Sequence, residues 1–433
     1  MPTDAATSAP RPDADSSVRG GRWAMGAASL ALLTFVTHAA NFGFTLLGAR
    51  LLAPGDFATL TAMLGIVLIG MAPGMALQAL TATGVLGGPA TIEPPIVRRV
   101  ALLFATLVAA IMIVLGPALG TGNPLSVVAI GAAAGLLPMS AANEGVLQGR
   151  GQFALLGVVL STGALVKLTV GATGMAVTSA VWAAACGIAM GYGAQLVLSR
   201  WMVGHRRPVD ASPGGTPAPT VIGSDADGIE DADSMFGLPR SVVSAVVMMG
   251  LLLVVLHVDA VMARLLLGDL AAGLYAVGAT AMRIVFWAPQ FVVLLLFPVL
   301  VTDPRRRIVA LAVGGLAAAG ALATLVAAAL GPALVPFVFG QEYAAIGADL
   351  WRFAWLGTAA VSLQVLCLSD LATGRREALW LLAATITTIV ATLMVMEPTA
   401  PVTIVTTVAT IVTGAVVLGT GRRLMHRSPT GPG

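Results

Sequence analysis

The side chains most able to do chemistry in this sequence are charged residues that stand inside long apolar runs. The only lysine, Lys167, lies within one run and Arg283 near the middle of another, and neither has an acidic residue at helical spacing. A charged side chain at the centre of a bilayer costs roughly 2.5 to 3.5 kcal/mol, so it usually faces a cavity or a partner. Lysine and arginine in such a place bind phosphate groups through charge-assisted hydrogen bonds. Both residues are therefore predicted to bind an anionic group.

Three further arginines are candidates for binding the same anion. Arg50 and Arg264 stand at matching ends of two apolar runs. An arginine at such a place also extends its side chain to lipid headgroups, which is the structural alternative. Arg352 follows Asp349 by one helical turn, with Glu342 close by, so a local ion pair is the alternative there.

Acidic residues inside the apolar runs are fewer. Asp259 follows His257 closely, and an intramembrane pair of this kind is a candidate for coupling to proton or sodium flow. The alternative is that Asp259 pairs with an arginine on a neighbouring helix.

Cys186 and Cys367 lack metal-ligand spacing and are expected to pack as small hydrophobic side chains. No catalytic residue, metal site or cofactor is predicted.

The composition is that of a membrane protein. Of 433 residues, 58% are hydrophobic and 10% are charged, with a mean hydropathy of +0.94. Soluble domains carry about 25% charged residues, so a soluble fold is excluded. The formal net charge of +3 is spread over short loops, which makes nucleic acid an unfavoured partner and membrane lipid the expected surroundings.

Apolar runs of spanning length recur along almost the whole chain. Crossing a bilayer takes roughly 20 apolar residues per helix. Runs of this kind lie at 23–48, 57–84, 97–119, 124–147, 152–173, 176–199, 241–267, 270–301, 308–330, 344–370, 377–396 and 401–421. The sequence therefore predicts an all-α membrane protein with about 12 transmembrane helices in two six-helix bundles.

Composition also divides the chain into bundles, tails and a linker. Polar, proline-rich or acidic segments cannot bury enough apolar area to become ordered. The predicted order is a disordered cytoplasmic tail, a first bundle, a flexible cytoplasmic linker, a second bundle and a short cytoplasmic tail. Their ranges are 1–22, 23–200, 201–238, 239–424 and 425–433.

Charge placement and an internal repeat give the orientation and symmetry. Most of the 23 lysines and arginines fall on one side if both termini are cytoplasmic, which is the orientation that the positive-inside rule favours.

Arg50 and Pro73 in the first half match Arg264 and Pro289 in the second. Six spans per half give both halves the same orientation, related by an axis along the membrane normal. We expect a multi-pass protein of the cell (inner) membrane, with the architecture of a transporter.

Four segments resemble the polysaccharide-biosynthesis flippases of the multidrug/oligosaccharidyl-lipid/polysaccharide (MOP) superfamily. They are NFGFTLLGARLLAPGDFATL in the first two spans, QGRGQFALLG after span four, HVDAVMARLLLGDLAAGLYAVGATAM in spans seven and eight, and FGQEYAAIGADLW before span ten. They occur in both halves and follow the family's order. The sequence departs from the family pattern at Asp56-Phe57-Ala58, where Phe-Gly is common.

The resemblance implies a non-enzymatic transporter that flips polyprenyl-pyrophosphate-linked oligosaccharide from the cytoplasmic to the outer leaflet by alternating access. The implied substrate is an anionic lipid-linked glycan, and a glycan polymerase or other polysaccharide-assembly proteins are the implied partners. A multidrug and toxin extrusion antiporter and a peptidoglycan-precursor flippase are the alternatives. The antiporter needs an anionic pocket, whereas the first span has no acidic residue. A membrane glycosyltransferase would need outer loops longer than those predicted here.

Overall fold

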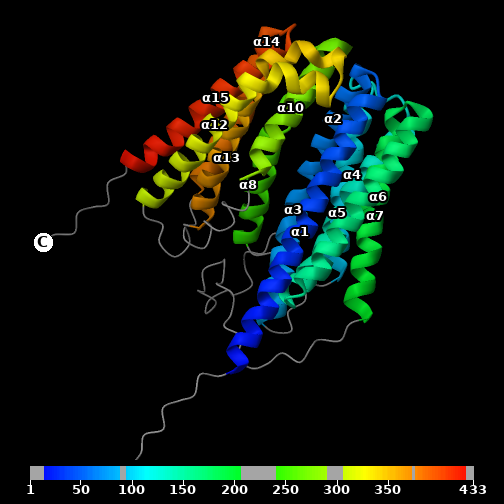
Figure 1. The fold of residues 1–433 in the computed structure, drawn as a ribbon, viewed down its shortest axis with the longest axis vertical. Coiled ribbons are helices and arrows are strands. Elements are labelled where there is room, and N and C mark those ends of the chain that lie inside the picture. The colour runs from blue at the N-terminus through cyan, green and yellow to red at the C-terminus, as the bar shows by residue number, and fades with distance from the viewer. Residues whose placement is uncertain (1–13, 88–93, 206–239, 290–305, 373–375, 426–433) are drawn as a thin grey trace, which may run out of the picture.

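The computed structural model describes residues 14–87, 94–205, 240–289, 306–372 and 376–425 (Figure 1). In these ranges every regular element is a helix, and 12 helical spans are long and apolar enough to cross a membrane. The predicted fold class and span number are confirmed. The predicted tails and linker lie largely outside the described residues, at 1–13, 206–238 and 426–433.

The helices follow the predicted apolar runs closely. In the first half they are α1 (Ala14–Leu51), α2 (Pro54–Ile69), α3 (Met71–Gly87), α4 (Pro94–Leu115), α5 (Pro124–Gly149), α6 (Phe153–Thr178) and α7 (Val181–His205). In the second half they are α8 (Arg240–Val255), α9 (Val258–Leu266), α10 (Asp269–Trp287), α12 (Arg306–Val338), the 3-10 helix η1 (Gln341–Asp349), α13 (Leu350–Ala372), α14 (Glu377–Met396) and α15 (Pro401–Met425). Helix α1 begins within the predicted tail, and α7 extends into the predicted linker.

Local chemistry explains where several of these helices begin and end. In hydrocarbon every backbone polar group must be paired within the segment, so apolar spans form helices. Prolines occupy the first turns of α2, α5 and α15, where a missing N–H costs nothing. The Asn123 side chain accepts a hydrogen bond of 2.9 Å from the Leu125 backbone N–H and so caps α5. Helix α6 ends at Thr178, and the next residue, Ser179, has a left-handed φ of 51°.

Two spans are interrupted, which the apolar runs did not predict. The span Pro54–Ala82 divides into α2 and α3 at Gly70, shortly before Pro73. The span Val246–Leu266 divides into α8 and α9 at Leu256 and His257, with neither glycine nor proline at the break. Discontinuous membrane helices place backbone ends and polar side chains at mid-membrane depth.

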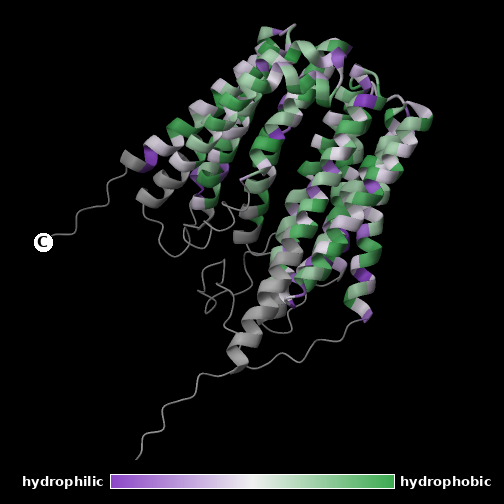
Figure 2. Ribbon diagram, viewed as in Figure 1, coloured by the Kyte–Doolittle hydropathy of each residue, from purple (hydrophilic) through white to green (hydrophobic). Residues whose placement is uncertain are grey.

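Within each half the helices pack closely side by side. In the first half α6 packs against α1 and α7, and α5 packs against α3, α4 and α7. A Cβ added at Gly187 of α7 would lie 2.5 Å from the Cα of Gly171 in α6, so only glycine fits there. In the second half α13 packs against α10, α12 and α15. Figure 2 shows mostly hydrophobic residues along the coloured parts of these helices, with hydrophilic residues at a few positions within them and at several of their ends.

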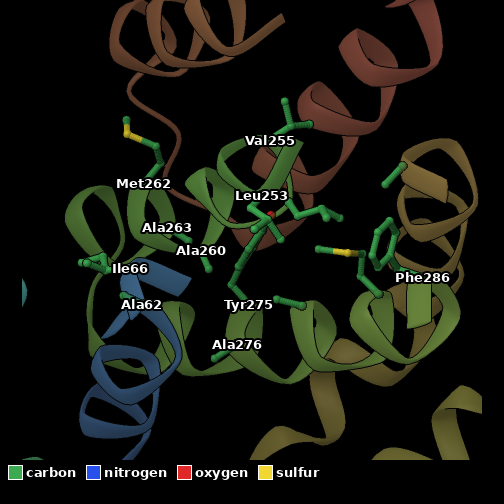
Figure 3. Packing of buried hydrophobic residues seen from close by; sticks show 14 of the residues in the cluster. Ala62, Ile66, Leu253, Val255, Ala260, Met262, Ala263, Tyr275, Ala276 and Phe286 are labelled. Atoms are coloured by element: carbon green, nitrogen blue, oxygen red, sulfur yellow. The ribbon is translucent and has the colours of Figure 1, made fainter. Parts of the chain in front are cut away.

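The two halves meet mainly through α2, which packs against α9 and α10, and through α3, which packs against α8. Figure 3 shows Ala62 and Ile66 of α2 facing the helix that carries Ala263 and Met262. In Figure 1 the two groups of helices converge at the upper end and diverge below it, the group with α1 running toward the bottom of the view and the group with α15 toward the left. We call the convergent end, made by the ends of α1, α2, α9, α10 and α12, the closed end. It is the predicted outer side.

Candidate functional site

Arg50 links the two halves at the closed end. It stands in the last turn of α1 and donates hydrogen bonds from Nε to the Val338 carbonyl at 2.8 Å and from Nη2 to the Phe337 carbonyl at 2.6 Å. These carbonyls belong to the C-terminal end of α12, where backbone oxygens lack helical partners and the helix dipole favours a cation. The predicted substrate-binding arginine therefore holds the first half against the second in this structure.

Arg264 makes the corresponding link in the other direction. It stands in the last turn of α9, and its Nε donates to the Thr59 hydroxyl of α2 at 2.8 Å, while its Nη1 lies 3.2 Å from the Asp269 carboxylate. Thr59 in turn donates a 2.5 Å hydrogen bond to the Leu119 carbonyl, just beyond α4. A Cβ added at Gly120 would lie 2.8 Å from Nη2 of Arg264.

Arg50 and Arg264 therefore both connect the two halves at the closed end, and we call these two residues the arginine latches. Arg50 and Arg264 occupy matching positions of the sequence repeat, and each donates hydrogen bonds to the opposite half: Arg50 to the end of α12, and Arg264 to Thr59 of α2, close to Gly120. Tyr343 adds a further link, because its hydroxyl donates to the Ala49 carbonyl at 3.2 Å. A Cβ added at Gly273 of α10 would lie 2.6 Å from Cβ of Pro54, which shows how closely the halves approach. The repeat read from sequence thus has a spatial counterpart at the closed end.

Lys167 is buried inside the first half. Its side chain is 9% exposed, its Nζ donates a hydrogen bond to the Asn41 side-chain oxygen of α1, and the Phe44 ring centroid lies 5.3 Å from Nζ. An aromatic face at this range attracts a cation. No carboxylate in the described part of the chain forms an ion pair with Lys167. The amide and the ring orient the ammonium group without neutralising its charge.

Arg283 lies in α10 within a buried polar group at the break between α8 and α9. We call His257, Asp259, Tyr275 and Arg283 the seam cluster. Tyr275 donates a 2.7 Å hydrogen bond to Oδ2 of Asp259, and His257 Nδ1 donates to the Leu253 carbonyl at 2.8 Å. Figure 3 shows the Tyr275 ring rising from α10 toward the segment that carries Leu253.

Four polar atoms of the seam cluster are buried without a hydrogen-bond partner. They are Nε2 of His257, Oδ1 of Asp259, and Nε and Nη2 of Arg283. Asp259 and Arg283 nevertheless interact electrostatically. Buried polar groups are nearly always paired, so a set of orphan atoms at one place marks a site that a ligand or a rearrangement completes. The structure thus brings the predicted coupling residues His257 and Asp259 together with the predicted anion-binding Arg283.

Arg352 is placed differently from the other candidates. Its Nε lies 3.0 Å from Oδ1 of Asp349, its Nη1 donates to the Thr406 hydroxyl at 3.2 Å, and its guanidinium lies 4.5 Å from the Trp351 ring centroid. All of these partners belong to the second half. The local ion pair considered from sequence is formed, and the substrate-binding role of Arg352 stays a prediction.

Sequence reasoning did not identify several partners of these side chains. Thr59 and Tyr275 were not candidates, because a lone hydroxyl in an apolar run carries no pattern of its own. Glu144, which is 4% exposed, accepts a 2.6 Å hydrogen bond from Gln195 of α7, and this buried pair also went unpredicted. Among the described residues no group of three or more His, Cys, Asp or Glu side chains is placed to hold a metal ion.

Comparison with known proteins bears on the fold. No protein-family model and no curated protein sequence matches the chain. Among solved structures, a multidrug resistance MATE family transporter of the MOP superfamily in an inward-facing conformation superposes with a TM-score of 0.60 at 12% identity, over 90% of this chain and 94% of that one. The lipid II flippase MurJ in an inward closed conformation gives 0.62 at 9% identity, over 91% and 86%.

A third similar structure is a MOP superfamily transporter from Pyrococcus furiosus, described as having a binding pocket of reverse polarity. It gives a TM-score of 0.51 at 12% identity, over 92% of this chain and 95% of that one. Each likeness spans nearly the whole of both chains and includes both halves. The chain is a multi-pass membrane protein with the fold of MOP superfamily transporters.

Proposed function

We propose that the protein is a transporter that flips polyprenyl-pyrophosphate-linked oligosaccharide from the cytoplasmic to the outer leaflet of the cell membrane for surface polysaccharide biosynthesis. The observation that carries the proposal is the pair Lys167 and Arg283. Each is a cation in a membrane span that no carboxylate in the described residues neutralises through a direct ion pair. A cation within a membrane span is stabilised by an anionic ligand, and a pyrophosphate headgroup carries dense negative charge.

Alternating access is the mechanism that fits the arrangement of the halves. The two groups of helices are joined at the closed end by the arginine latches and spread apart at the opposite end (Figure 1). With the predicted orientation, the spread end faces the cytoplasm. The headgroup and glycan would enter there, and the polyprenyl tail would stay in lipid. A glycan polymerase or other polysaccharide-assembly proteins are the proposed partners on the outer side.

A peptidoglycan-precursor flippase is the second candidate, because it also handles a polyprenyl pyrophosphate and because lipid II flippase MurJ has a similar fold. The cation antiporter is less well supported. The first span lacks acidic residues, Asp370 is paired with Arg423, and Glu144 accepts a hydrogen bond from Gln195. Asp259 is held by Tyr275 at one oxygen only, and the charge of Arg283 beside it disfavours a cation there. An organic cation would meet Lys167 and Arg283 instead of a carboxylate.

Translocation in vesicles tests the proposal. We expect the purified full chain to increase the rate at which fluorescent lipid-linked oligosaccharide becomes accessible to a membrane-impermeant reagent, at least tenfold over protein-free vesicles. Excess unlabelled peptidoglycan precursor should compete weakly if the oligosaccharide is the substrate and strongly if the precursor is. Export of an organic cation without movement of either glycolipid would contradict the proposal and identify an antiporter.

A further inference from the structure

The seam cluster places a carboxylate and a guanidinium near each other without joining them. Oδ2 of Asp259 is held by the Tyr275 hydroxyl at 2.7 Å, while its Oδ1 has no partner. Nε and Nη2 of Arg283 are also buried and unpartnered, and the two charges interact across the space between them. Tyr275 thus holds the carboxylate on α9 while its free oxygen and the free edge of Arg283 remain unsatisfied.

The cluster lies at the seam between the two halves. His257 stands at the break between α8 and α9, and a Cβ added at Gly65 of α2, in the first half, would lie 2.9 Å from the His257 Cβ. Asp259 is 0% exposed, whereas the Arg283 side chain as a whole is partly exposed although two of its nitrogens are buried. Asp259 is therefore fully buried, whereas part of Arg283 remains accessible.

We propose that Asp259 competes with the anionic headgroup of the substrate for Arg283, and that Tyr275 limits this competition by holding the carboxylate back. The inference rests on the proposed function, because it specifies how one of the two cations is kept available. A carboxylate that paired fully with Arg283 would cancel its charge, whereas a carboxylate held by a tyrosine reduces the charge only in part. Asp259 thus sets the affinity of the site without touching the substrate.

Other readings of Asp259 explain the cluster less well. A metal cation at the carboxylate would be repelled by Arg283, and no group of three or more acidic, His or Cys ligands surrounds it among the described residues. A plain structural ion pair would join Oδ1 to the guanidinium, yet these atoms are orphans. Lys167 has no comparable competitor, since its hydrogen-bond partner is the neutral amide of Asn41. The two cations are therefore expected to respond differently to loss of a carboxylate.

Two substitutions with opposite expected effects test the competition. Asp259→Asn keeps an oxygen for the Tyr275 hydroxyl but removes the negative charge, so polyprenyl pyrophosphate should bind the detergent-solubilised full chain about tenfold more tightly. Tyr275→Phe releases the carboxylate to pair with Arg283, so binding should weaken about tenfold.

A double variant and a control check that the effect passes through Arg283. In Asp259→Asn with Arg283→Ala, affinity should equal that of Arg283→Ala alone. Glu397→Gln, which neutralises an exposed carboxylate just beyond α14, is the control and should leave affinity unchanged.

The outcomes separate this inference from the proposed function. If the wild type binds polyprenyl pyrophosphate and Asp259→Asn binds it equally or more weakly, the competition is wrong while the anion site stands. If both single variants weaken binding, Asp259 and Tyr275 only position Arg283. If the wild type does not bind polyprenyl pyrophosphate at all, the proposed function fails together with the inference. A thermal unfolding midpoint within a few degrees of wild type shows that each variant is folded.

Discussion

Replacing Lys167 and Arg283 together by alanine should reduce the rate of lipid-linked oligosaccharide translocation at least a hundredfold. Hydrogen bonds to charged groups contribute about 1.5 to 3 kcal/mol each, and every 1.4 kcal/mol is a tenfold change in affinity. Loss of two such contacts with the pyrophosphate therefore removes most of the affinity for the headgroup. Initial rates in vesicles with equal amounts of inserted protein provide the measurement.

Matched variants show whether the loss comes from the headgroup contacts. Arg98→Ala with Arg99→Ala also removes two cations, but from exposed positions on α4, and should retain the wild-type rate. Lys167→Arg with Arg283→Lys keeps both charges and should recover part of the activity. A double alanine variant that inserts normally and transports like the wild type would remove the basis for the cationic site.

Removing both arginine latches, by Arg50→Ala with Arg264→Ala, should open the closed end. The two side chains supply three hydrogen bonds between the halves, from Nε and Nη2 of Arg50 and from Nε of Arg264. These groups are partly solvated, so we expect about 1 to 2 kcal/mol in total and a shift of roughly tenfold toward the open arrangement. Alternating access predicts this shift because the latches exist only while the halves touch at this end.

The reactivity of a cysteine introduced at a buried position between the halves measures how far the closed end opens. Ala62 of α2 is 0% exposed and faces the second half, so Ala62→Cys should be protected from a membrane-impermeant thiol reagent in a chain with Cys186→Ser and Cys367→Ser (Figure 3). Addition of the latch substitutions should raise the labelling rate about tenfold. Arg352→Ala, whose observed partners all lie within the second half, is the control and should leave the cysteine protected. Equal protection in all three proteins would mean that the latches do not hold the end closed.

Most of the fold was predictable from sequence because hydropathy and charge are local properties. Each of the predicted runs corresponds to an observed span, although residues 290–301 of the eighth run lie outside the described part of the chain. Pro54, Pro124 and Pro401 mark helix starts that the sequence encodes. The break at Leu256 and His257 was not predictable, since no glycine or proline marks it. Tertiary packing against Gly65 accompanies the break, and such packing has no local sequence signal.

The residues of the candidate site were predictable from sequence, but the contacts between them were not. Intramembrane charges are rare, so Lys167 and Arg283 stood out by composition alone. Which side chains contact one another was not predictable, because Asn41 lies 126 positions from Lys167 and the carbonyls that Arg50 contacts lie 287 and 288 positions away. The repeat indicated that Arg50 and Arg264 share one role, yet only the structure shows both reaching the opposite half. Their predicted contact with substrate stays a prediction for the state in which the latches are released.

The most direct test of the central claim compares two ligands that differ only in the charge of the head. Affinities of the purified wild-type protein should be measured for a polyprenyl-pyrophosphate-linked glycan and for the same glycan on an uncharged polyprenyl linkage. Because neither Lys167 nor Arg283 forms a direct ion pair with a described carboxylate, we predict at least tenfold tighter binding of the pyrophosphate form, and loss of that preference in the double alanine variant. Equal affinity of the wild type for both ligands would contradict the account.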